Sequence, residues 1–371
     1  MNIGINASGI SRIKGGASFY IINITHALAA IDKENSYFVF CSTISSRELA
    51  NLPKNFRIIA GAPRHVFLRL VWEQSILPLF LCKKYGISVL FSPNYTSPIL
   101  HPGFRSIVTI HDLSFYPLSK LYPLKRRLFK PIIKFSVRVA DKVIAVSEYT
   151  RKDILKYIGD FGKKVTVVYE AADKRFGDSV SIKAINDTRT KFGIKNEYVL
   201  FTGFLEPRKN LERLLEAFAK IKEDVPHDLV MTGAKGWWYD STYKKVESLG
   251  IAGRVIFTGY VSDHELPSLY AGAALFAFPS LYEGFGISVL EAICCGTPVL
   301  VSNNTSLPEV AGEAGVYVDP YDVGDISMKL KKVLVNPAER AALKRKCPKV
   351  KINFSWEKAA RQTLQVILGV A

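Results

Sequence analysis

Short apolar runs rich in β-branched residues alternate along the chain with longer segments whose apolar positions recur at helical spacing. In the first half, the runs predict strands at residues 37–41, 89–92, 107–110, 143–146 and 165–169. In the second half, they predict strands at residues 198–202, 229–232, 255–258, 275–279, 299–302 and 315–318. Strands separated by helix-length segments are typical of parallel sheets built from β-α-β units. The pattern therefore predicts an α/β protein.

A polar stretch between residues 174 and 195 interrupts this alternation, and the strand–helix pattern restarts after it. We therefore expect two Rossmann-like domains, each an open, doubly wound parallel sheet, facing one another across a cleft. The N-terminal domain would span residues 1–178 and the C-terminal domain residues 179–354. Sheets of this kind bind ligands beyond the carboxyl ends of their strands, so the residues that follow each strand are the first candidates for chemistry.

The composition excludes several classes of protein. The sequence has 371 residues, 48% of them hydrophobic and 22% charged, which is enough apolar material for two cores and excludes wholesale disorder. No apolar run reaches the roughly 18 residues of a membrane-spanning helix, and the N-terminus lacks the pattern of a signal peptide. The five cysteines are scattered without a C-x-x-C pair, which argues against a disulfide framework or a structural zinc site. We expect a cytoplasmic protein.

Positive charge is concentrated in the first half of the chain. Residues 1–180 contain 26 Lys and Arg against 12 Asp and Glu, whereas the remainder contains 24 against 21. A one-sided positive field attracts nucleic acid, an anionic membrane surface or phosphorylated substrates. Because the sequence contains no zinc-finger, RNP or helix-turn-helix pattern, nucleic acid is not expected as a partner.

The segment 118–139 predicts a basic amphipathic helix, in which six apolar residues share one face and most basic residues lie on another. Pro123 and Pro131 predict that the helix begins after the first proline and kinks near the second. Such a helix can lie on an anionic membrane, or its apolar face can cover the N-terminal sheet, and the sequence leaves both open. The candidate membrane or acceptor contacts are Lys125, Arg126, Arg127 and Lys130.

The first chemical motif follows the strand predicted at residues 198–202. Gly203 is followed by two adjacent cations, Arg208 and Lys209, and then by Asn210, which suits the N-cap of the next helix. A glycine turn, two cations and a helix N-terminus together suit a bound diphosphate. On spacing alone, a solvated pair of cations at a helix start is an equal alternative.

The second motif follows the strand predicted at residues 275–279. Glu283 precedes Gly284, Phe285 and Gly286, and Glu291 lies two turns into the next helix. The glycines allow backbone N–H groups to approach a ligand, and a carboxylate accepts hydrogen bonds from neighbouring sugar hydroxyls. Two such acids beside a phosphate site suit a nucleotide sugar. They could equally compensate a helix dipole or form an acid/base pair, because the sequence does not fix their distance.

Together, these motifs resemble the retaining family 4 glycosyltransferases of the GT-B fold. The hallmark of that family is two glutamates separated by seven residues, as Glu283 and Glu291 are. The resemblance extends over nearly the whole chain. Gly15 and Gly16 stand where the family has a glycine loop after its first strand, and His111 stands where it has a histidine after a later strand. Residues 355–371 resemble its C-terminal helix, which in the family packs back on the N-terminal domain.

The resemblance implies a role for each matching residue. Arg208 and Lys209 would neutralise the donor diphosphate. Glu283 and the backbone after it would hold the donor sugar, whereas Glu291 would bind the ribose. The remaining donor contacts would be Gly16, Gly203, Tyr260, Val261, Gly284, Phe285 and Gly286, with His111 at the transferring sugar. Many relatives have an Asn-Gly turn after the last strand of the first domain, where this chain has residues 167–173, so the contact made by that turn is open.

The implied activity is a retaining, metal-independent transfer of a sugar, first of all mannose from GDP-mannose, to a lipid-linked glycan or a cell-surface polysaccharide precursor. The segment 64–74 loosely resembles bacterial polysaccharide mannosyltransferases. Since the chain has no Asp-x-Asp pair, two cations would take the place of a metal, and no cofactor is expected. The enzyme would lie on the inner face of the cytoplasmic membrane. A soluble synthase acting on free sugars or glucan, and a non-catalytic nucleotide-sugar-binding protein, stay open as alternatives.

Overall fold

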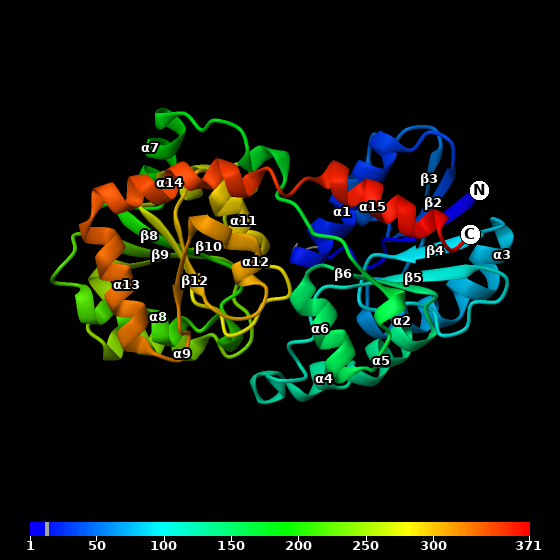
Figure 1. Cartoon of the computed structure of the whole chain (residues 1–371), viewed down its shortest axis with the longest axis horizontal. Coiled ribbons are helices and arrows are strands. Elements are labelled where there is room, and N and C mark those ends of the chain that lie inside the picture. The colour runs from blue at the N-terminus through cyan, green and yellow to red at the C-terminus, as the bar shows by residue number, and fades with distance from the viewer. Residues whose placement is uncertain (12–14) are drawn as a thin grey trace. The chain divides into compact units, whose positions relative to one another are not determined.

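The computed structural model describes residues 1–11 and 15–371 and divides the chain into two compact units (Figure 1). The first unit comprises Met1–Ala171 and Phe354–Ala371, and the second comprises Ala172–Asn353. The sequence placed the boundary at residue 178 instead. The segment after Ala171 belongs to the second unit because Phe176 packs against Tyr270 and Arg175 forms an ion pair with Asp263.

The first unit is built on a seven-stranded parallel sheet with the order β3-β2-β1-β4-β5-β6-β7. Its strands are β1 (Asn2–Asn6), β2 (Ser36–Cys41), β3 (Phe56–Ala60), β4 (Val89–Ser92), β5 (Arg105–Ile110), β6 (Lys142–Ala145) and β7 (Val165–Val167). The sequence analysis did not predict β1 or β3. β1 is short and begins and ends with Asn, which disfavours strands, but its Ile3 and Ile5 are fully buried at the centre of the sheet.

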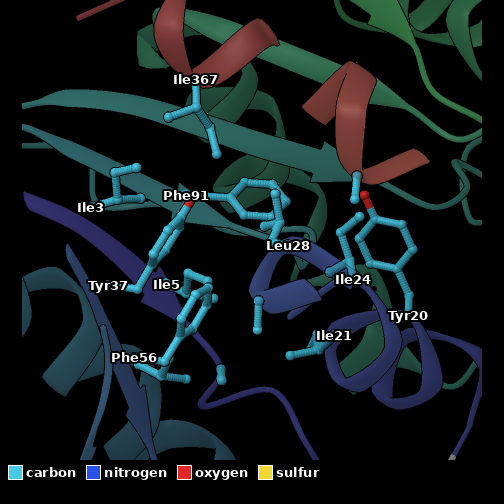
Figure 2. Close-up of a cluster of buried hydrophobic side chains, with 14 of the residues drawn as sticks. Ile3, Ile5, Tyr20, Ile21, Ile24, Leu28, Tyr37, Phe56, Phe91 and Ile367 are labelled. Atoms are coloured by element: carbon cyan, nitrogen blue, oxygen red, sulfur yellow. The ribbon is translucent and has the colours of Figure 1, made fainter. Parts of the chain in front are cut away.

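The helices of the first unit connect and cover these strands. They are α1 (Gly16–Ile31), α2 (Val66–Gln74), α3 (Cys82–Lys84), α4 (Leu124–Arg127), α5 (Lys130–Val139), α6 (Glu148–Tyr157) and α15 (Trp356–Leu368). Short 3-10 turns, η1 (Ser45–Leu49), η3 (Ser119–Leu121) and η4 (Gly162–Lys164), and a π-type turn, η2 (Leu77–Leu81), complete the connections. Figure 2 shows the core, in which Leu28 of α1 and Ile367 of α15 pack over Phe91 of the sheet. The C-terminal helix is therefore part of the N-terminal core.

The predicted amphipathic helix is interrupted in the structure. α4 begins directly after Pro123, as expected, but the chain breaks at residues 128–129 before α5 begins with Pro131 in its first turn. The break shifts the helical phase, so α5 faces the core with Ile133 and Val137. Leu124, Leu128 and Phe135 of the predicted apolar face are 69%, 66% and 50% exposed. These three of its six residues therefore do not cover the sheet, whereas Leu121, Ile132 and Val139 are partly buried.

The second unit contains a six-stranded parallel sheet with the order β10-β9-β8-β11-β12-β13. Its strands are β8 (Tyr198–Thr202), β9 (Asp228–Thr232), β10 (Val255–Gly259), β11 (Leu275–Phe278), β12 (Val299–Ser302) and β13 (Gly315–Val318), each within one residue of the prediction. Its helices are α7 (Ile182–Lys191), α8 (Leu211–Ile221), α9 (Asp240–Ser248), α10 (Leu266–Gly272), α11 (Ile287–Cys294), α12 (Leu307–Ala311), α13 (Val323–Val335) and α14 (Pro337–Lys351). Four short 3-10 turns are η5 (Lys174–Phe176), η6 (Pro207–Lys209), η7 (Ala252–Arg254) and η8 (Gly312–Ala314).

Each sheet reverses its strand order once, between β1 and β4 in the first unit and between β8 and β11 in the second. At such a point, the connections after the two neighbouring strands leave in opposite directions, and their ends form a crevice in which ligands bind. The residues after β8 and β11 are those of the two predicted motifs. The sheet topology therefore brings both motifs to one place.

Candidate active site

The segment after β8 is held in a fixed conformation. Gly203 has a φ of 144°, and Gly233 lies so close to it that an added Cβ would stand 2.0 Å from Gly203 O. Asn210 has a left-handed backbone at the N-cap position of α8. The sequence suggested that the Asn210 side chain caps the helix, but it does not. It donates instead to Pro279 O at 2.9 Å and to Pro320 O at 2.6 Å. It thereby fastens this segment to the loop after β11.

Four charged side chains meet beyond β8 and β11. Lys209 Nζ donates to Glu283 Oε1 at 2.7 Å, and Arg208 Nη1 lies 2.9 Å from Glu283 Oε2. The other side of the Arg208 guanidinium donates to Glu206 Oε1 at 2.9 Å. These side chains are at most 13% exposed. The alternative of a solvated cation pair at Arg208 and Lys209 is therefore wrong.

Glu283 is ionised within this cluster. Burial opposes the charged form, but Arg208 and Lys209 outweigh it and lower the pKa of Glu283 to about 2. Ser280 donates its hydroxyl to Oε1 at 2.6 Å. Burial and the adjacent Arg208 lower the pKa of Lys209, and Glu283 and Glu206 partly offset that effect. Two formal positive charges thus face two formal negative charges.

The glycine segment after Glu283 is shaped by its neighbours. Gly286 has a φ of 97°, and an added Cβ would stand 2.6 Å from the Leu307 side chain. Ser306 Oγ donates to Glu283 O and Phe285 O, both at 3.0 Å. Gly284 is buried beside them. The turn that begins α11 therefore has a conformation that only glycine adopts easily.

Glu291 differs from Glu283 in its surroundings. It is 9% exposed on α11, and Tyr270 donates its hydroxyl to Glu291 Oε2 at 2.9 Å. Burial raises the pKa of Glu291 to about 8, and the Tyr270 hydroxyl offsets only part of that effect. The charge of Arg175 lowers that pKa, but Arg175 is itself paired with Asp173 and Asp263. The two glutamates therefore occupy different protonation states at neutral pH.

We expect Glu291→Gln to raise the melting temperature of the second unit at pH 8.5 by several degrees and to change it little at pH 5, given about 2–4 °C per kcal/mol in a unit of this size. Because the folded-state pKa of about 8 exceeds the usual glutamate pKa of 4.5, the folded state keeps a proton that the unfolded chain releases as the pH rises between these values. Wild-type stability therefore falls through that window. Calorimetry between pH 5 and 9 measures the melting temperatures of the wild type and of Glu291→Gln, with the exposed Glu247→Gln as control. If the melting temperatures of the wild type and of Glu291→Gln change with pH in parallel, the prediction is wrong.

The remaining donor candidates lie at several places in the two units. Tyr260 and Val261 follow β10, where Tyr260 is 62% exposed and Val261 is buried. Gly16 is the first residue of α1, with no atom within 4 Å of an added Cβ. His111 follows β5, and its Nδ1 lies 3.0 Å from Glu170 Oε1. The structure brings together Gly203, Arg208, Lys209, Glu283 and the glycine segment, whereas Gly16 and His111 belong to the other unit.

Sequence reasoning missed two groups at the centre of the site. Glu206 stands two residues before Arg208 on an extended backbone, and that spacing is the only local signal for their contact. Ser280 follows β11, the position where the topology rule looks for chemistry, but it was not singled out. Tyr270, the partner of Glu291, lies on α10 and has no sequence signal. Within residues 1–11 and 15–371, no group of three His, Cys, Asp or Glu side chains is placed to hold a metal ion.

Comparison with known proteins identifies the family. Residues 14–176 match the model for glycosyltransferase family 4, and residues 184–350 match the model for glycosyl transferases group 1. O-antigen chain mannosyltransferase B of Escherichia coli is 32% identical over 286 residues, which cover 76% of this chain and 74% of that protein. The chain belongs to the family 4 glycosyltransferases. The predicted family and the predicted enzyme class are confirmed.

Solved structures of glycosyltransferases share the fold of this one. Sucrose-phosphate synthase of Thermosynechococcus elongatus is 21% identical and superimposes with a TM-score of 0.80 over 100% of this chain and 99% of its own. HepE of Anabaena, solved with UDP and glucose, is 18% identical with a TM-score of 0.77 over the full length of both chains. The predicted architecture of two Rossmann-like parallel sheets of the GT-B type is thus confirmed. None of the helices in the described part of this glycosyltransferase is long and apolar enough to cross a bilayer.

Proposed function

We propose that this glycosyltransferase transfers mannose from GDP-mannose, with retention and without a metal ion, to a lipid-linked glycan or polysaccharide precursor. The observation that carries the proposal is the Arg208–Lys209–Glu283 cluster beyond β8 and β11. Such a cluster offers cations to a diphosphate and a carboxylate to sugar hydroxyls. The choice of mannose follows the O-antigen chain mannosyltransferase, at 32% identity.

Binding of the donor would rearrange the ion pairs of the cluster. The diphosphate would take over Arg208 and Lys209 from their carboxylates, and Glu283 would be released to accept hydrogen bonds from the sugar. Negative charge grows on the diphosphate as the sugar leaves, so the two cations stabilise the transition state more than the ground state. We propose a front-face route in which the leaving phosphate oxygen accepts the proton of the acceptor hydroxyl.

The test is transfer of radiolabelled sugar from a donor panel to a lipid extract of cells that synthesise O-antigen. We expect GDP-mannose to label the lipid fraction and UDP-glucose, UDP-galactose and ADP-glucose to leave it unlabelled. A melting-temperature screen with GDP, UDP and ADP reads donor binding separately, since a ligand of the native state raises that temperature. A shift with UDP alone would replace the donor, and labelling of free sugars alone would favour a soluble synthase.

We also propose that the first unit binds an anionic membrane surface, where a lipid-linked acceptor resides. Arg126 is exposed, whereas Arg127 donates to Tyr122 O at 2.9 Å and Lys130 lies over the Tyr116 ring. The side chain of Lys125 lies outside the described residues. Apolar side chains exposed on the same unit are the second observation that supports the proposal. On α4, α5, α2, η2 and the loop after β4, those at least half exposed are Leu124, Leu128, Phe135, Phe67, Leu68, Val71, Phe80 and Leu100.

Hydrogen bonds tie three of these elements, α2, the loop after β4 and α5, to one another. Gln74 at the end of α2 donates to Ser97 O and accepts from Ile99 N, and Ser136 of α5 bonds Ser97. α2, the loop after β4 and α5 therefore form one continuous part of the first unit (Figure 1). Cations and exposed apolar side chains on a single structural block fit a surface of anionic lipid, because charge attracts the block and the apolar groups enter the interface.

We expect the double substitution Phe67→Ser and Leu128→Ser to weaken binding to phosphatidylglycerol-containing vesicles by about tenfold or more. Each exposed side chain that enters the lipid contributes on the order of 1–2 kcal/mol, part of the value for full burial. Vesicle co-sedimentation measures the change. Ile182→Ser with Ile352→Ser is the matched control, because both are strongly exposed in the second unit. Equal loss in the control, or none in the test variant, would contradict the proposal.

A further inference from the structure

His111 is enclosed by two hydrogen-bond acceptors at the carboxyl ends of the first unit's strands. Its Nδ1 lies 3.0 Å from Glu170 Oε1, and its Nε2 lies 3.2 Å from the carbonyl oxygen of Pro93. Glu170 comes three residues after β7 ends, and Pro93 directly follows β4. The His111 and Glu170 side chains are 8% and 7% exposed. Neither ring nitrogen is therefore left over for another protein partner.

The two contacts fix the number of protons on the pair. A carbonyl oxygen only accepts, so the contact with Pro93 places a proton on Nε2 of His111. The contact between Nδ1 and Glu170 needs a second proton, either on the ring or on the carboxyl group. With this second proton on the ring, the pair is an imidazolium beside a carboxylate.

The groups around the pair keep this arrangement in place. The Tyr20 ring meets His111 edge-on at 4.8 Å between centroids, and Tyr95 lies 5.4 Å away. Burial raises the pKa of Tyr20, and the charge of Glu170 raises it further, so Tyr20 stays neutral. The carboxylate of Asp112, the residue after His111, accepts a hydrogen bond from the Tyr95 hydroxyl at 2.6 Å. Glu170 is thus the carboxyl group that contacts the His111 ring.

We propose that Glu170 is a positioning residue that holds His111 as a fixed imidazolium, and that His111 acts in sugar transfer as a fixed cation, not as a base. The inference rests on the transferase function proposed above. In that route the acceptor proton goes to the leaving phosphate, so His111 has no proton to take. It also gives Glu170 a role within the segment 167–173, which stands in place of the Asn-Gly turn of many relatives.

The first test reads the ring directly and needs no substrate. In the full-length protein labelled with ¹⁵N-histidine, we expect the His111 signals at pH 7.5 to be those of an imidazolium with both nitrogens protonated. Comparison with the spectrum of His111→Gln assigns these signals. In Glu170→Gln, the same signals should become those of a neutral ring with one protonated nitrogen. A neutral His111 ring in the wild-type protein would overturn the inference.

The second test uses kinetics with the sugar donor. We expect Glu170→Gln to lower kcat roughly 10- to 100-fold, the range for loss of one hydrogen bond to a charged group, with a change below about twofold in the donor KM. Glu170→Asp should restore part of kcat, and His111→Gln should add little to the loss in Glu170→Gln. The control is Glu357→Gln, at an exposed ion pair of α15. A kcat for Glu170→Gln equal to wild type would overturn the inference.

The two tests separate this inference from the function on which it rests. If the enzyme turns over no nucleotide sugar, the proposed function fails, and the NMR result still decides the state of His111. If transfer occurs but the His111 ring is neutral, the function stands and the role of Glu170 falls. The melting temperature of Glu170→Gln, measured beside both tests, shows whether the variant is folded.

Discussion

Glu283→Gln loses at least about 100-fold in kcat/KM while it stays folded. The carboxylate accepts hydrogen bonds from Lys209 and Ser280 and pairs with Arg208, so the substitution removes a charge and keeps nearly the same shape. An amide offers the sugar hydroxyls one neutral acceptor oxygen in place of two charged ones. Removal of one such group from a preorganised site costs about 10²- to 10³-fold. Steady-state kinetics with GDP-mannose measures the loss.

The same substitution lowers the stability of the protein without ligand. Glutamine leaves Arg208 and Lys209 with Glu206 as their remaining carboxylate, and breaking a buried ion pair on one side costs on the order of 3–5 kcal/mol. A bound nucleoside diphosphate returns negative charge to these cations. We therefore expect the melting temperature of Glu283→Gln to rise more with GDP than that of the wild type.

The exposed Glu212→Gln, in the first turn of α8, serves as the control for both measurements. It removes one carboxylate of the same unit outside the cluster. Wild-type kcat/KM in Glu283→Gln would remove Glu283 from the site. An equal loss in Glu212→Gln would point to a general effect of charge.

The location of the candidate site could be predicted from the sequence, because the strand topology determines it. Arg208 and Glu283 are distant in sequence, but each follows a strand, and a β-α-β pattern implies that strand ends gather at one edge. Glu206 and Ser280 sit at the same two strand ends and were missed, because which oxygen a guanidinium or carboxylate contacts depends on side-chain geometry. Strand order and local motifs thus predict where the site lies, whereas the hydrogen-bond and ion-pair partners within it depend on side-chain packing.

The sequence pattern predicted three features of the first unit less well. Helical periodicity over residues 118–139 assumed one continuous helix, and the break at residues 128–129 changed the face that turns inward. β1 was missed because its few apolar residues are flanked by Asn, although Gly4 is needed there: an added Cβ would stand 2.9 Å from Leu90. The contact between His111 and Glu170 joins residues 59 apart and depends on burial, which no local pattern reports.

Substitution of both cations, Arg208→Gln with Lys209→Met, raises the dissociation constant of GDP by about 100-fold or more. Charged hydrogen bonds contribute about 1.5–3 kcal/mol each, and in the proposed site the two side chains would supply at least one apiece to the diphosphate. Both replacements retain most of the side-chain length, which matters because Lys209 Nζ also lies 4.7 Å from the centre of the Phe278 ring. Isothermal titration with GDP measures the change.

Guanosine separates the diphosphate from the rest of the nucleotide in that experiment. If Arg208 and Lys209 bind the diphosphate, the variant loses affinity for GDP and keeps its weak affinity for guanosine. A loss of both ligands would mean that the variant is misfolded, which its melting temperature shows independently. Unchanged GDP affinity in a folded variant would assign the two cations another role: they would hold Glu283 in place by the pairs at 2.9 and 2.7 Å, and the diphosphate would bind elsewhere.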